Sequence, residues 1–371
     1  MNNQMTLTFV LAVVGLGDRA ASNVYAEPPA ATSVNRLTVD DLANAEFKRV
    51  IGKAYGGSSF DTGGPGSWYE NTAAAPTVVH DGKFYRMWFV GSDKTEDPGV
   101  PYGVYERIGL ATSRDGIHWK VANDGKPVLD LGPAGSADAK GLAHPYVLKV
   151  GGKFMMWYGG IDGKQAKDLG LGPAHVRIER ICLATSDDGI HWKRANDGKP
   201  VLDIGPKGSS DSIQATGMHV LQIDDKFVMW YGAYNGRHTL AMATSPDGLR
   251  WTKANGGEPV IGLLGKQQLG PTVHFDGRRY YLLYEKNLNH SWAMFAATSD
   301  DGIHWQTANY GEPVLGPPPT GNFGTAGEGR NHSVHPSQII ILGWRVCVWY
   351  GAEDGSPPHY QRIGLMEARI P

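Results

Sequence analysis

Short runs of apolar and β-branched residues, separated by glycine-rich turns, recur along this chain. The run at 108–129 (IGLATSRDGIHWKVANDGKPVL) returns as near-copies at 181–202, 240–261 and 295–315. Each copy opens with an apolar stretch, breaks at an Asp-Gly pair and continues to a Trp and a Pro-Val segment. Asp-Gly between apolar runs is the strongest short signal for a β-hairpin. The pattern therefore predicts a repeated unit built from strands.

Two more strand-like runs precede each copy, and a fifth pair precedes the C-terminal IGLMEARI segment. The pairs fall at 75–80 and 84–90, 144–150 and 154–158, 219–223 and 227–231, 271–275 and 280–284, and 334–342 and 345–350. The serines of the Ala-Thr-Ser triplets stand at 113, 186, 245 and 299, a long repeat of the kind found in propellers and solenoids. Four strands per unit and five units predict an all-β, five-bladed β-propeller with four-stranded antiparallel blades.

The C-terminal unit ends at Pro371 before its outer strand. The segment 48–61 (KRVIGKAYGGSSFD) resembles the segments at 126–138 and 199–211 that follow the same run in other copies. We expect residues 49–52 to supply the missing strand, because an N-terminal strand there closes the ring and removes two exposed edges. Residues 48–371 then form the propeller.

The first 47 residues divide into two predicted segments. Residues 1–26 resemble a secretory signal peptide, with an apolar core at 5–17 that is too short to span a bilayer. Residues 27–47 form a lead-in segment. We expect a secreted or periplasmic protein, with the cytoplasm as the alternative, existing as a monomer or weak dimer.

Composition supports this interpretation and narrows the partners. The 371 residues include 50 Gly and 11 Trp and are 19% charged, which suits short strands joined by turns better than helices. The net charge of −2, without a basic cluster, argues against nucleic acid and anionic membranes as partners. Cys182 and Cys347 fall in predicted strands of different units and are expected to be buried free thiols.

The blade count and the Ser-x-Asp-Gly-x-x-Trp and Met-Trp-Tyr-Gly motifs resemble those of the five-bladed propeller glycoside hydrolases over residues 48–371. That superfamily includes arabinanases, β-xylosidases, invertases, levansucrases and mannoside phosphorylases. The resemblance implies an enzyme that acts on a glycosidic bond of a small-molecule or oligosaccharide substrate at the axial funnel, with no required cofactor. Arabinanase-like relatives place carboxylates before a proline at the start of the first strand. The matching positions here hold Ala75, His144, Gly217, Gly270 and His335.

Loops that vary on a repeating scaffold usually carry function, so we expect the site on the face with the variable loops. His144 and His335 could bind a divalent metal ion such as calcium in the channel, act as acid or base, or bind channel water. His219, two positions beyond its matching residue, could point down the same channel.

Residues that interrupt the repeat supply the other candidates. Glu328 and Glu70 have no counterpart in other units and could act as acid or base. Glu285 replaces the glycine of other copies and should face the site. Trp68 and Tyr146 could stack on sugar rings. The candidate catalytic residues are Glu328, His335, His144 and Glu70, and the candidate binding residues are Arg330, Asn331, Glu285, His219, Asn71, Tyr146 and Trp68.

Two alternatives to a glycosidase stay open from the sequence. One is a non-hydrolytic propeller that binds a glycan or a partner in a funnel lined by aromatic residues and His, and a shallow polar groove would favour it. The other is a propeller recruited as a lyase or cyclase that uses His and Glu as acid and base. A site lined mainly by Trp, Tyr and Met would favour this last alternative.

Overall fold

The β-branched and aromatic runs form strands, and the Asp-Gly pairs form the turns between them, as predicted. The computed structural model describes residues 37–96, 104–172, 176–265, 267–288, 292–315, 334–353 and 361–370. They belong to one unit that begins at Leu37, and the predicted signal peptide lies outside them. None of the helices in these ranges is long and apolar enough to cross a membrane.

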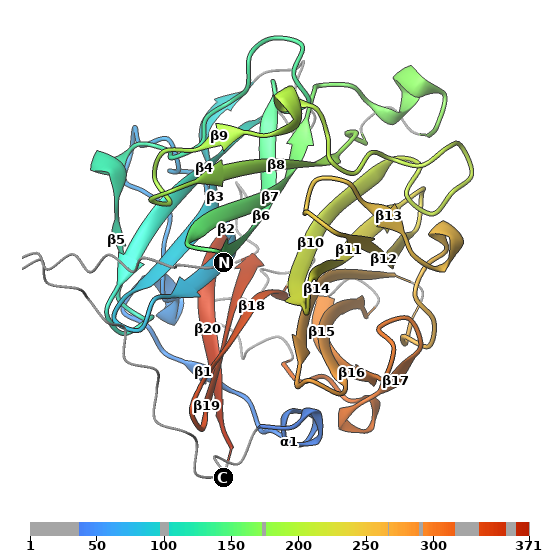
Figure 1. The fold of residues 1–371 in the computed structure, drawn as a ribbon. Coiled ribbons are helices and arrows are strands. Elements are labelled where there is room, and N and C mark those ends of the chain that lie inside the picture. Colours follow the sequence, from blue (N-terminus) through green and yellow to red (C-terminus); the bar gives the residue numbers. More distant parts are fainter. Residues whose placement is uncertain are drawn as a thin grey trace, which may run out of the picture. The chain divides into compact units, whose positions relative to one another are not determined.

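Within the described residues, three separate sheets each hold four strands in chain order, all antiparallel (Figure 1). The first comprises β6 (Gly141–Val150), β7 (Lys153–Ile161), β8 (Arg180–Ser186) and β9 (Lys193–Arg194). The second comprises β10 (Gln214–Ile223), β11 (Lys226–Tyr234), β12 (His238–Ser245) and β13 (Thr252–Lys253). The third comprises β14 (Gln268–Phe275), β15 (Tyr280–Asn287), β16 (Trp292–Ser299) and β17 (Trp305–Thr307).

A larger sheet contains the strands from the two ends of this unit. It comprises β1 (Lys48–Val50), β2 (Thr72–His80), β3 (Tyr85–Glu96), β4 (Val104–Ser113), β5 (Lys120–Val121), β18 (Val334–Leu342), β19 (Arg345–Glu353) and β20 (Gln361–Arg369). A parallel pairing of Thr72 with Gln361 joins β2 to β20. The rest of the sheet pairs antiparallel, with β2–β5 on one side of this joint and β18–β20 with β1 on the other.

The remaining regular structure is short. One α-helix, α1 (Val39–Ala43), precedes β1. The 3-10 turns are η1 (Tyr55–Gly57), η2 (Asn123–Gly125), η3 (Ala166–Leu169), η4 (Asn196–Gly198), η5 (Asn255–Gly257) and η6 (Asn309–Gly311). The first strands form a closed circle of neighbours, because β2 contacts β6, β6 contacts β10, β10 contacts β14, β14 contacts β18, and β18 contacts β2.

The N-terminal strand joins the C-terminal sheet segment, as the sequence predicted. β1 runs antiparallel to β20, with Lys48 opposite Glu367 and Val50 opposite Leu365. The observed strand covers Lys48–Val50, slightly earlier than the predicted 49–52. Pairing the two ends of the unit covers an edge of β20 that would otherwise be open to other chains.

Each Ser-x-Asp-Gly turn is held by its own side chains and docks onto a neighbouring unit. In one example, Ser245 Oγ accepts a hydrogen bond from the N–H of Gly248 at 2.8 Å. The indole N–H of Trp157 donates to the carbonyl of Gly248 at 2.9 Å. Gly248 has a φ of +76°, and a Cβ there would lie 2.9 Å from the Trp157 ring, so both the turn and the contact require glycine.

The same contact recurs between other units. The pairs are Trp88 with Gly189, Trp230 with Gly302, and Trp349 with Gly116. Leu283 on β15 takes the place of the Trp in the unit before β18.

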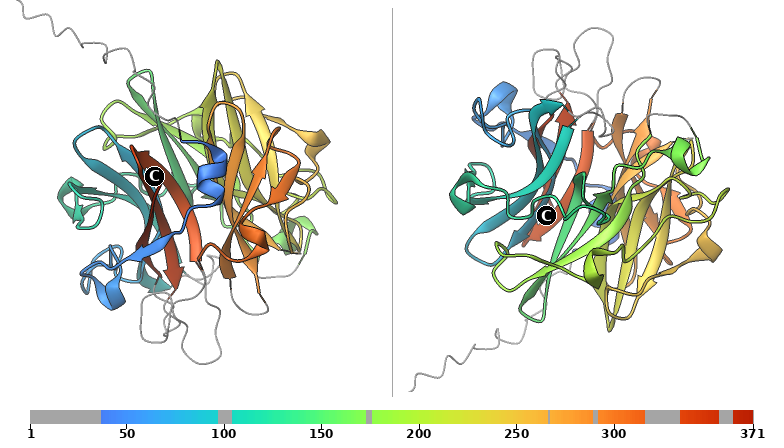
Figure 2. Two further views of the ribbon diagram at one scale, coloured as in Figure 1. Left: turned by 90° about the horizontal axis from the view of Figure 1, so that it is seen from below. Right: turned by 90° about the horizontal axis from the view of Figure 1, so that it is seen from above.

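The helix α1 fills the space beside Leu283. Val39, Leu42 and Phe47 are buried in one apolar cluster with Leu283 and residues of β16, β18 and β19. Figure 2 shows the blue helix between the orange strands and the red strands. The lead-in segment therefore contributes to the core through its last residues.

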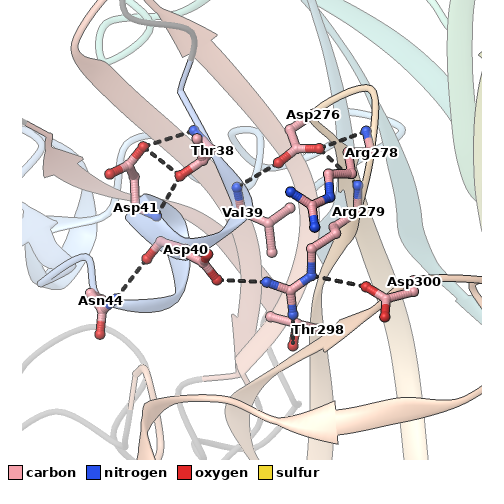
Figure 3. A network of polar contacts seen from close by, with 10 residues as sticks. All are labelled: Thr38, Val39, Asp40, Asp41, Asn44, Asp276, Arg278, Arg279, Thr298 and Asp300. Atoms are coloured by element: carbon pink, nitrogen blue, oxygen red, sulfur yellow. Dashed lines mark hydrogen bonds and ion pairs between the residues drawn. The ribbon is translucent and has the colours of Figure 1, made fainter.

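Polar contacts around α1 fix its orientation (Figure 3). Thr38 caps the helix and shares hydrogen bonds with Asp41. Asp276 accepts from the N–H of Val39 at 2.9 Å. Arg279 bridges Asp40 of the helix at 2.7 Å and Asp300 at 3.0 Å. The ion pairs of Arg279 with Asp40 and Asp300 are exposed, so we expect the apolar cluster to contribute most to holding α1 in place.

The turn aspartates make stability depend on pH. The N–H of Arg250 lowers the pKa of Asp247 most, burial opposes this, and with the N–H of Leu249 the pKa falls to about 2. The ionised carboxylate of Asp247 stabilises the folded state fully above the unfolded-state pKa of about 4. This stabilisation is lost as the pH falls toward the folded-state pKa of about 2. We expect Asp247→Asn to be less stable than wild type at pH 6 in urea unfolding. The difference should shrink at pH 2, and an unchanged difference would contradict this origin.

Candidate functional site

A pocket of about 930 Å³ opens where the first strands of the units begin. Its wall includes Thr72 of β2, His144 of β6, Thr216 of β10, Gly270 of β14 and His335 of β18. The volume is within the range of small-molecule sites. Of the residue types that would favour the lyase or cyclase alternative, Met218 lines the pocket, whereas no Trp or Tyr of the described chain does.

A β-bulge in each first strand shapes this end. The register of β6 against β7 shifts between Ala143 and Tyr146, and the registers of β2, β10 and β14 shift at corresponding positions. His144 sits in the bulge with a φ of +47°. Left-handed backbone is unfavourable by about 1–2 kcal/mol for a residue with a side chain. Bulges next to active sites commonly redirect a side chain, which is what this bulge does for His144.

The unit containing His335 has a different bulge. Its register shifts between Pro336 and Gln338, and His335 still pairs with Gly351 of β19. Proline cannot adopt a positive φ, so Pro336 cannot take the conformation of His144. His335 accordingly lies one residue further from Trp349 than His144 lies from Trp157.

His144 lies beside a buried carboxylate. Its Nδ1 is 3.2 Å from Oγ1 of Thr216 and 3.8 Å from Oε2 of Glu179. The Glu179 side chain is 3% exposed and that of His144 is 45% exposed. The imidazole of His144 is therefore accessible from the pocket, and the carboxylate of Glu179 lies buried on its Nδ1 side.

Arg177 connects this pair to a second carboxylate. Its Nε contacts Oε1 of Glu179, and its Nη1 lies 2.6 Å from Oε2 of Glu106 on β4. Burial would raise the pKa of Glu179, but the guanidinium of Arg177 and the nearby His144 and Thr216 side chains lower it well below the usual range. Glu179 is therefore an anion at neutral pH.

A second imidazole–carboxylate pair lines the same pocket. The Nδ1 of His335 lies 2.5 Å from Oε2 of Glu285, whose side chain is 2% exposed. Glu285 occupies the position on β15 where β7, β11 and β19 have glycine. Its side chain lines the pocket, and its part in a functional site stays a prediction.

Glycines make room for both carboxylates. A Cβ at Gly270 would lie 2.3 Å from Oε1 of Glu285, and Gly270 also has a φ of +55°. A Cβ at Gly159 would lie 2.8 Å from Oγ1 of Thr216 and 3.1 Å from Oε2 of Glu179. Larger residues at either glycine would displace the acid.

His238 of β12 completes this side of the pocket. Burial lowers its pKa to about 4, although the charge of Glu179 acts in the opposite direction. Its ring packs 4.4 Å from the ring of Tyr234. At neutral pH it is an uncharged wall residue.

His219 and Tyr146 lie deeper than the sequence suggested. His219 is 1% exposed and Tyr146 2% exposed, and Nε2 of His219 is 3.2 Å from the Tyr146 hydroxyl. Thr77 and Gln338 stand at the same register in other units and share a 3.2 Å hydrogen bond. Neither His219 nor Tyr146 lines the pocket, because these side chains join neighbouring first strands below it.

The other predicted residues divide between the pocket and its surroundings. Asn71 lines the pocket. The carboxylate of Glu70 instead accepts from the N–H of Gly66 at 2.7 Å. The indole of Trp68 donates to the carbonyl of Gly125 at 2.7 Å and stacks on Phe89. Glu70 and Trp68 are absent from the pocket wall. Glu328, Arg330 and Asn331 lie outside the described residues.

Four residues of the site were not predicted from the sequence: Glu179, Arg177, Glu106 and His238. A signal for three of them exists, because Glu106, Glu179 and His238 each stand seven residues before the serine of an Ala-Thr-Ser triplet. In all three units the third strand (β4, β8 or β12) begins within two residues of this Glu or His, at the end that lies close to the pocket.

The described residues contain no cluster of three or more His, Cys, Asp or Glu side chains suited to a metal ion. Both imidazoles of the predicted metal pair, His144 and His335, face a carboxylate through Nδ1. Metal binding by this pair stays a prediction.

No protein-family model matches the chain. Over 157 residues it is 30% identical to an uncharacterized protein of Mycobacterium tuberculosis, covering 41% of the chain and 46% of that protein. Over 165 residues it is 30% identical to a 1,2-beta-oligomannan phosphorylase of Thermoanaerobacter sp., covering 44% and 46%. The chain thus matches less than half the length of these curated relatives.

Solved structures match most of the chain. The structure of a glycoside hydrolase has a TM-score of 0.66 at 17% identity, covering 89% of this chain and 94% of the other. A member of the GH130 family of mannoside phosphorylases and glycoside hydrolases has a TM-score of 0.58 at 20% identity, covering 87% and 99%. Beta-1,2-mannobiose phosphorylase from Listeria innocua has a TM-score of 0.61 at 13% identity, covering 84% and 94%. The predicted resemblance to propeller glycoside hydrolases is confirmed for the fold.

Proposed function

We propose that this protein is a carbohydrate-active enzyme, built as a five-bladed propeller, that cleaves a glycosidic bond in the pocket. The observation that carries the proposal is the pair of buried carboxylates, Glu179 and Glu285, each facing an imidazole on the same pocket wall. The closed circle of β2, β6, β10, β14 and β18 supports the blade count.

Glycosidic cleavage needs one group that protonates the leaving oxygen and another that activates the nucleophile or forms a bond to the sugar. His144 and His335 each turn Nδ1 toward a carboxylate, which orients the ring and strengthens it as a proton carrier. Such a site works with side chains alone, so the proposed reaction requires no cofactor.

The names of similar proteins narrow the range of candidate substrates. Four of the similar proteins are named for β-1,2-linked mannosides, three as phosphorylases and one from a family that also contains glycoside hydrolases. We propose by analogy that the substrate of this protein is a β-linked mannoside and that water is the nucleophile.

The test is turnover of a glycoside panel that includes β-1,2-mannobiose, with and without inorganic phosphate, followed by chromatography of the products. We expect free monosaccharide from wild type and none from the double variant Glu179→Gln/Glu285→Gln. If a sugar 1-phosphate forms when phosphate is present, then phosphate rather than water is the nucleophile. No product from any glycoside, or equal product from both proteins, would overturn the proposal.

A further inference from the structure

The unit of β10 breaks the repeat at a position on the pocket wall, directly after Gly217. Four units have proline at the corresponding position (Pro76, Pro145, Pro271 and Pro336), and this unit has Met218. Met218 is 5% exposed and lines the pocket. A proline ring is rigid, whereas the unbranched thioether of methionine adapts its shape to an apolar neighbour. The unit of β10 therefore presents an adaptable apolar side chain where its neighbours have a rigid ring.

Two glycines of the same unit leave space beside Met218. Gly217 and Gly232 both line the pocket, and a Cβ at Gly217 would meet no heavy atom within 4 Å. A Cβ at Gly232 would lie 3.6 Å from Cδ2 of Leu269, which belongs to β14 and also lines the pocket. We call Gly217, Met218, Gly232 and Leu269 the Met218 wall.

In the other four units a side chain occupies the space that Gly217 leaves open. Three of these side chains stand at the position of Gly217 itself, and the fourth lies over the glycine of its unit. They are Ala75, His144, His335 and, over Gly270, Glu285. The Met218 wall is therefore the part of the described pocket with most room for a group of the ligand.

The unit of β10 also brings no formal charge to the pocket at neutral pH. Its lining residues are Gln214, Thr216, Gly217, Met218, Gly232 and His238. Burial lowers the pKa of His238 to about 4, so this imidazole is uncharged. Oγ1 of Thr216 lies 3.2 Å from Nδ1 of His144, and Nε2 of Gln214 donates to the carbonyl of Arg177 at 3.0 Å. Because these polar groups have partners inside the protein, the wall offers mainly apolar atoms to a ligand.

We propose that the Met218 wall binds an apolar leaving group, and that the substrate is a β-linked alkyl or aryl mannoside. This inference rests on the proposed function and names the substrate class for the same pocket. A sugar against this wall would bury hydroxyl groups without partners, which costs free energy, whereas an alkyl chain gains by leaving water. In the circle of first strands the wall lies between the unit of Glu179 and the unit of Glu285, the two proposed carboxylates.

Hydrolysis of such a substrate gives mannose and an alcohol or a phenol. The bond between the anomeric carbon and the leaving oxygen breaks, its electrons pass to that oxygen, and the oxygen takes up a proton. Water supplies the new hydroxyl group of the anomeric carbon and releases a proton. Atoms and charge therefore balance without a further reactant.

The test measures the dissociation constants of alkyl thio-β-mannosides with methyl, propyl and pentyl chains by isothermal titration calorimetry. Sulfur in place of the glycosidic oxygen keeps the ligand intact during the measurement. We expect Kd to fall by about fourfold for each added methylene, because each one leaves water at the Met218 wall. A Kd that stays constant along the series in wild type would overturn the inference.

Variants locate the alkyl chain within the pocket. Met218→Gln keeps the length of the side chain but places an amide in the wall, and it should remove most of the dependence on chain length. Met218→Leu stays apolar at similar volume and should keep the dependence. Each series compares ligands on one protein, so a lower folded fraction of a variant changes the binding stoichiometry and leaves the trend in Kd.

Val104→Thr is the matched control, because it makes an apolar residue of the pocket polar at nearly the same shape on β4. It should keep the full dependence on chain length. The assignment to the Met218 wall would be overturned if Met218→Gln kept the full dependence, or if Val104→Thr lost as much of it as Met218→Gln.

Cleavage assays separate this inference from the proposed function. We expect kcat/KM for pentyl β-mannoside to exceed that for methyl β-mannoside by about 10²-fold, the effect of four methylenes leaving water, and Met218→Gln should reduce this ratio. If wild type cleaves mannobiose but its thiomannoside series is flat, the proposed function stands and this inference fails. If wild type cleaves no glycoside, the proposed function fails, and calorimetry still decides whether the Met218 wall binds apolar chains.

Discussion

Glu285→Gln is expected to lower kcat by about 10²–10⁴-fold, the usual range for losing a general acid–base group. The amide keeps the size of the side chain but removes the negative charge that faces Nδ1 of His335. Because Oε2 lies 2.5 Å from Nδ1 of His335, the substitution acts directly on the imidazole. Initial rates on a glycoside cleaved by wild type measure the effect.

The value of KM should change far less than kcat. Glu285 is 2% exposed, so it reaches the substrate mainly through His335 and contributes little to ground-state binding. Glu258→Gln is the matched control, because Glu258 lies in the outer loop after η5, away from the pocket wall, and should leave both constants unchanged. A kcat within a factor of about 3 of wild type would remove the Glu285–His335 pair from the chemistry.

The strands could be predicted from the sequence because their signals are local. Asp-Gly turns, alternating apolar runs and a recurring Trp determine the hairpins within about 20 residues of chain. The closing strand was also predictable, because 48–61 resembles two other segments that follow the same run. Its exact start was not, since the pairing of Lys48 with Glu367 depends on a strand more than 300 residues away.

The site was predictable only where it breaks the repeat. Glu285 could be predicted because three other units have glycine at its position, and it lines the pocket in the structure. Glu179 was not predicted because it does not interrupt the repeat. The sequence Glu-Arg-Ile begins at Glu179 and also at Glu106. Its importance depends on Arg177, which reaches back 71 residues to Glu106. Such contacts arise from the arrangement of sheets and leave no local pattern.

The depth of side chains below the pocket was also outside the reach of the sequence. His219 and Tyr146 share a register two positions beyond the bulge residue of their strands. Counting along an ideal strand suggests that they point in nearly the same direction as the residue at the mouth. The bulge breaks this alternation, and the two rings meet each other between adjacent first strands.

Leu42→Ala is expected to lower the free energy of unfolding by about 2–5 kcal/mol, the range for truncating a buried leucine. Leu42 is 1% exposed and packs in the cluster that contains Leu283. In the other units a Trp bonded to an Asp-Gly turn joins neighbours, but here α1 performs that packing. Loss of the contact should therefore weaken the place where the N-terminal and C-terminal parts of the unit meet.

Asp40→Asn on the same helix supplies the contrast. Its carboxylate lies 2.7 Å from Arg279, but the Asp40 side chain is 73% exposed, and such pairs contribute about 1 kcal/mol or less. Urea unfolding of both variants at pH 7 compares the apolar and ionic contributions on one element. If Leu42→Ala proved no less stable than Asp40→Asn, the apolar cluster would not be what holds α1. The polar network of Figure 3 would then have to account for its attachment.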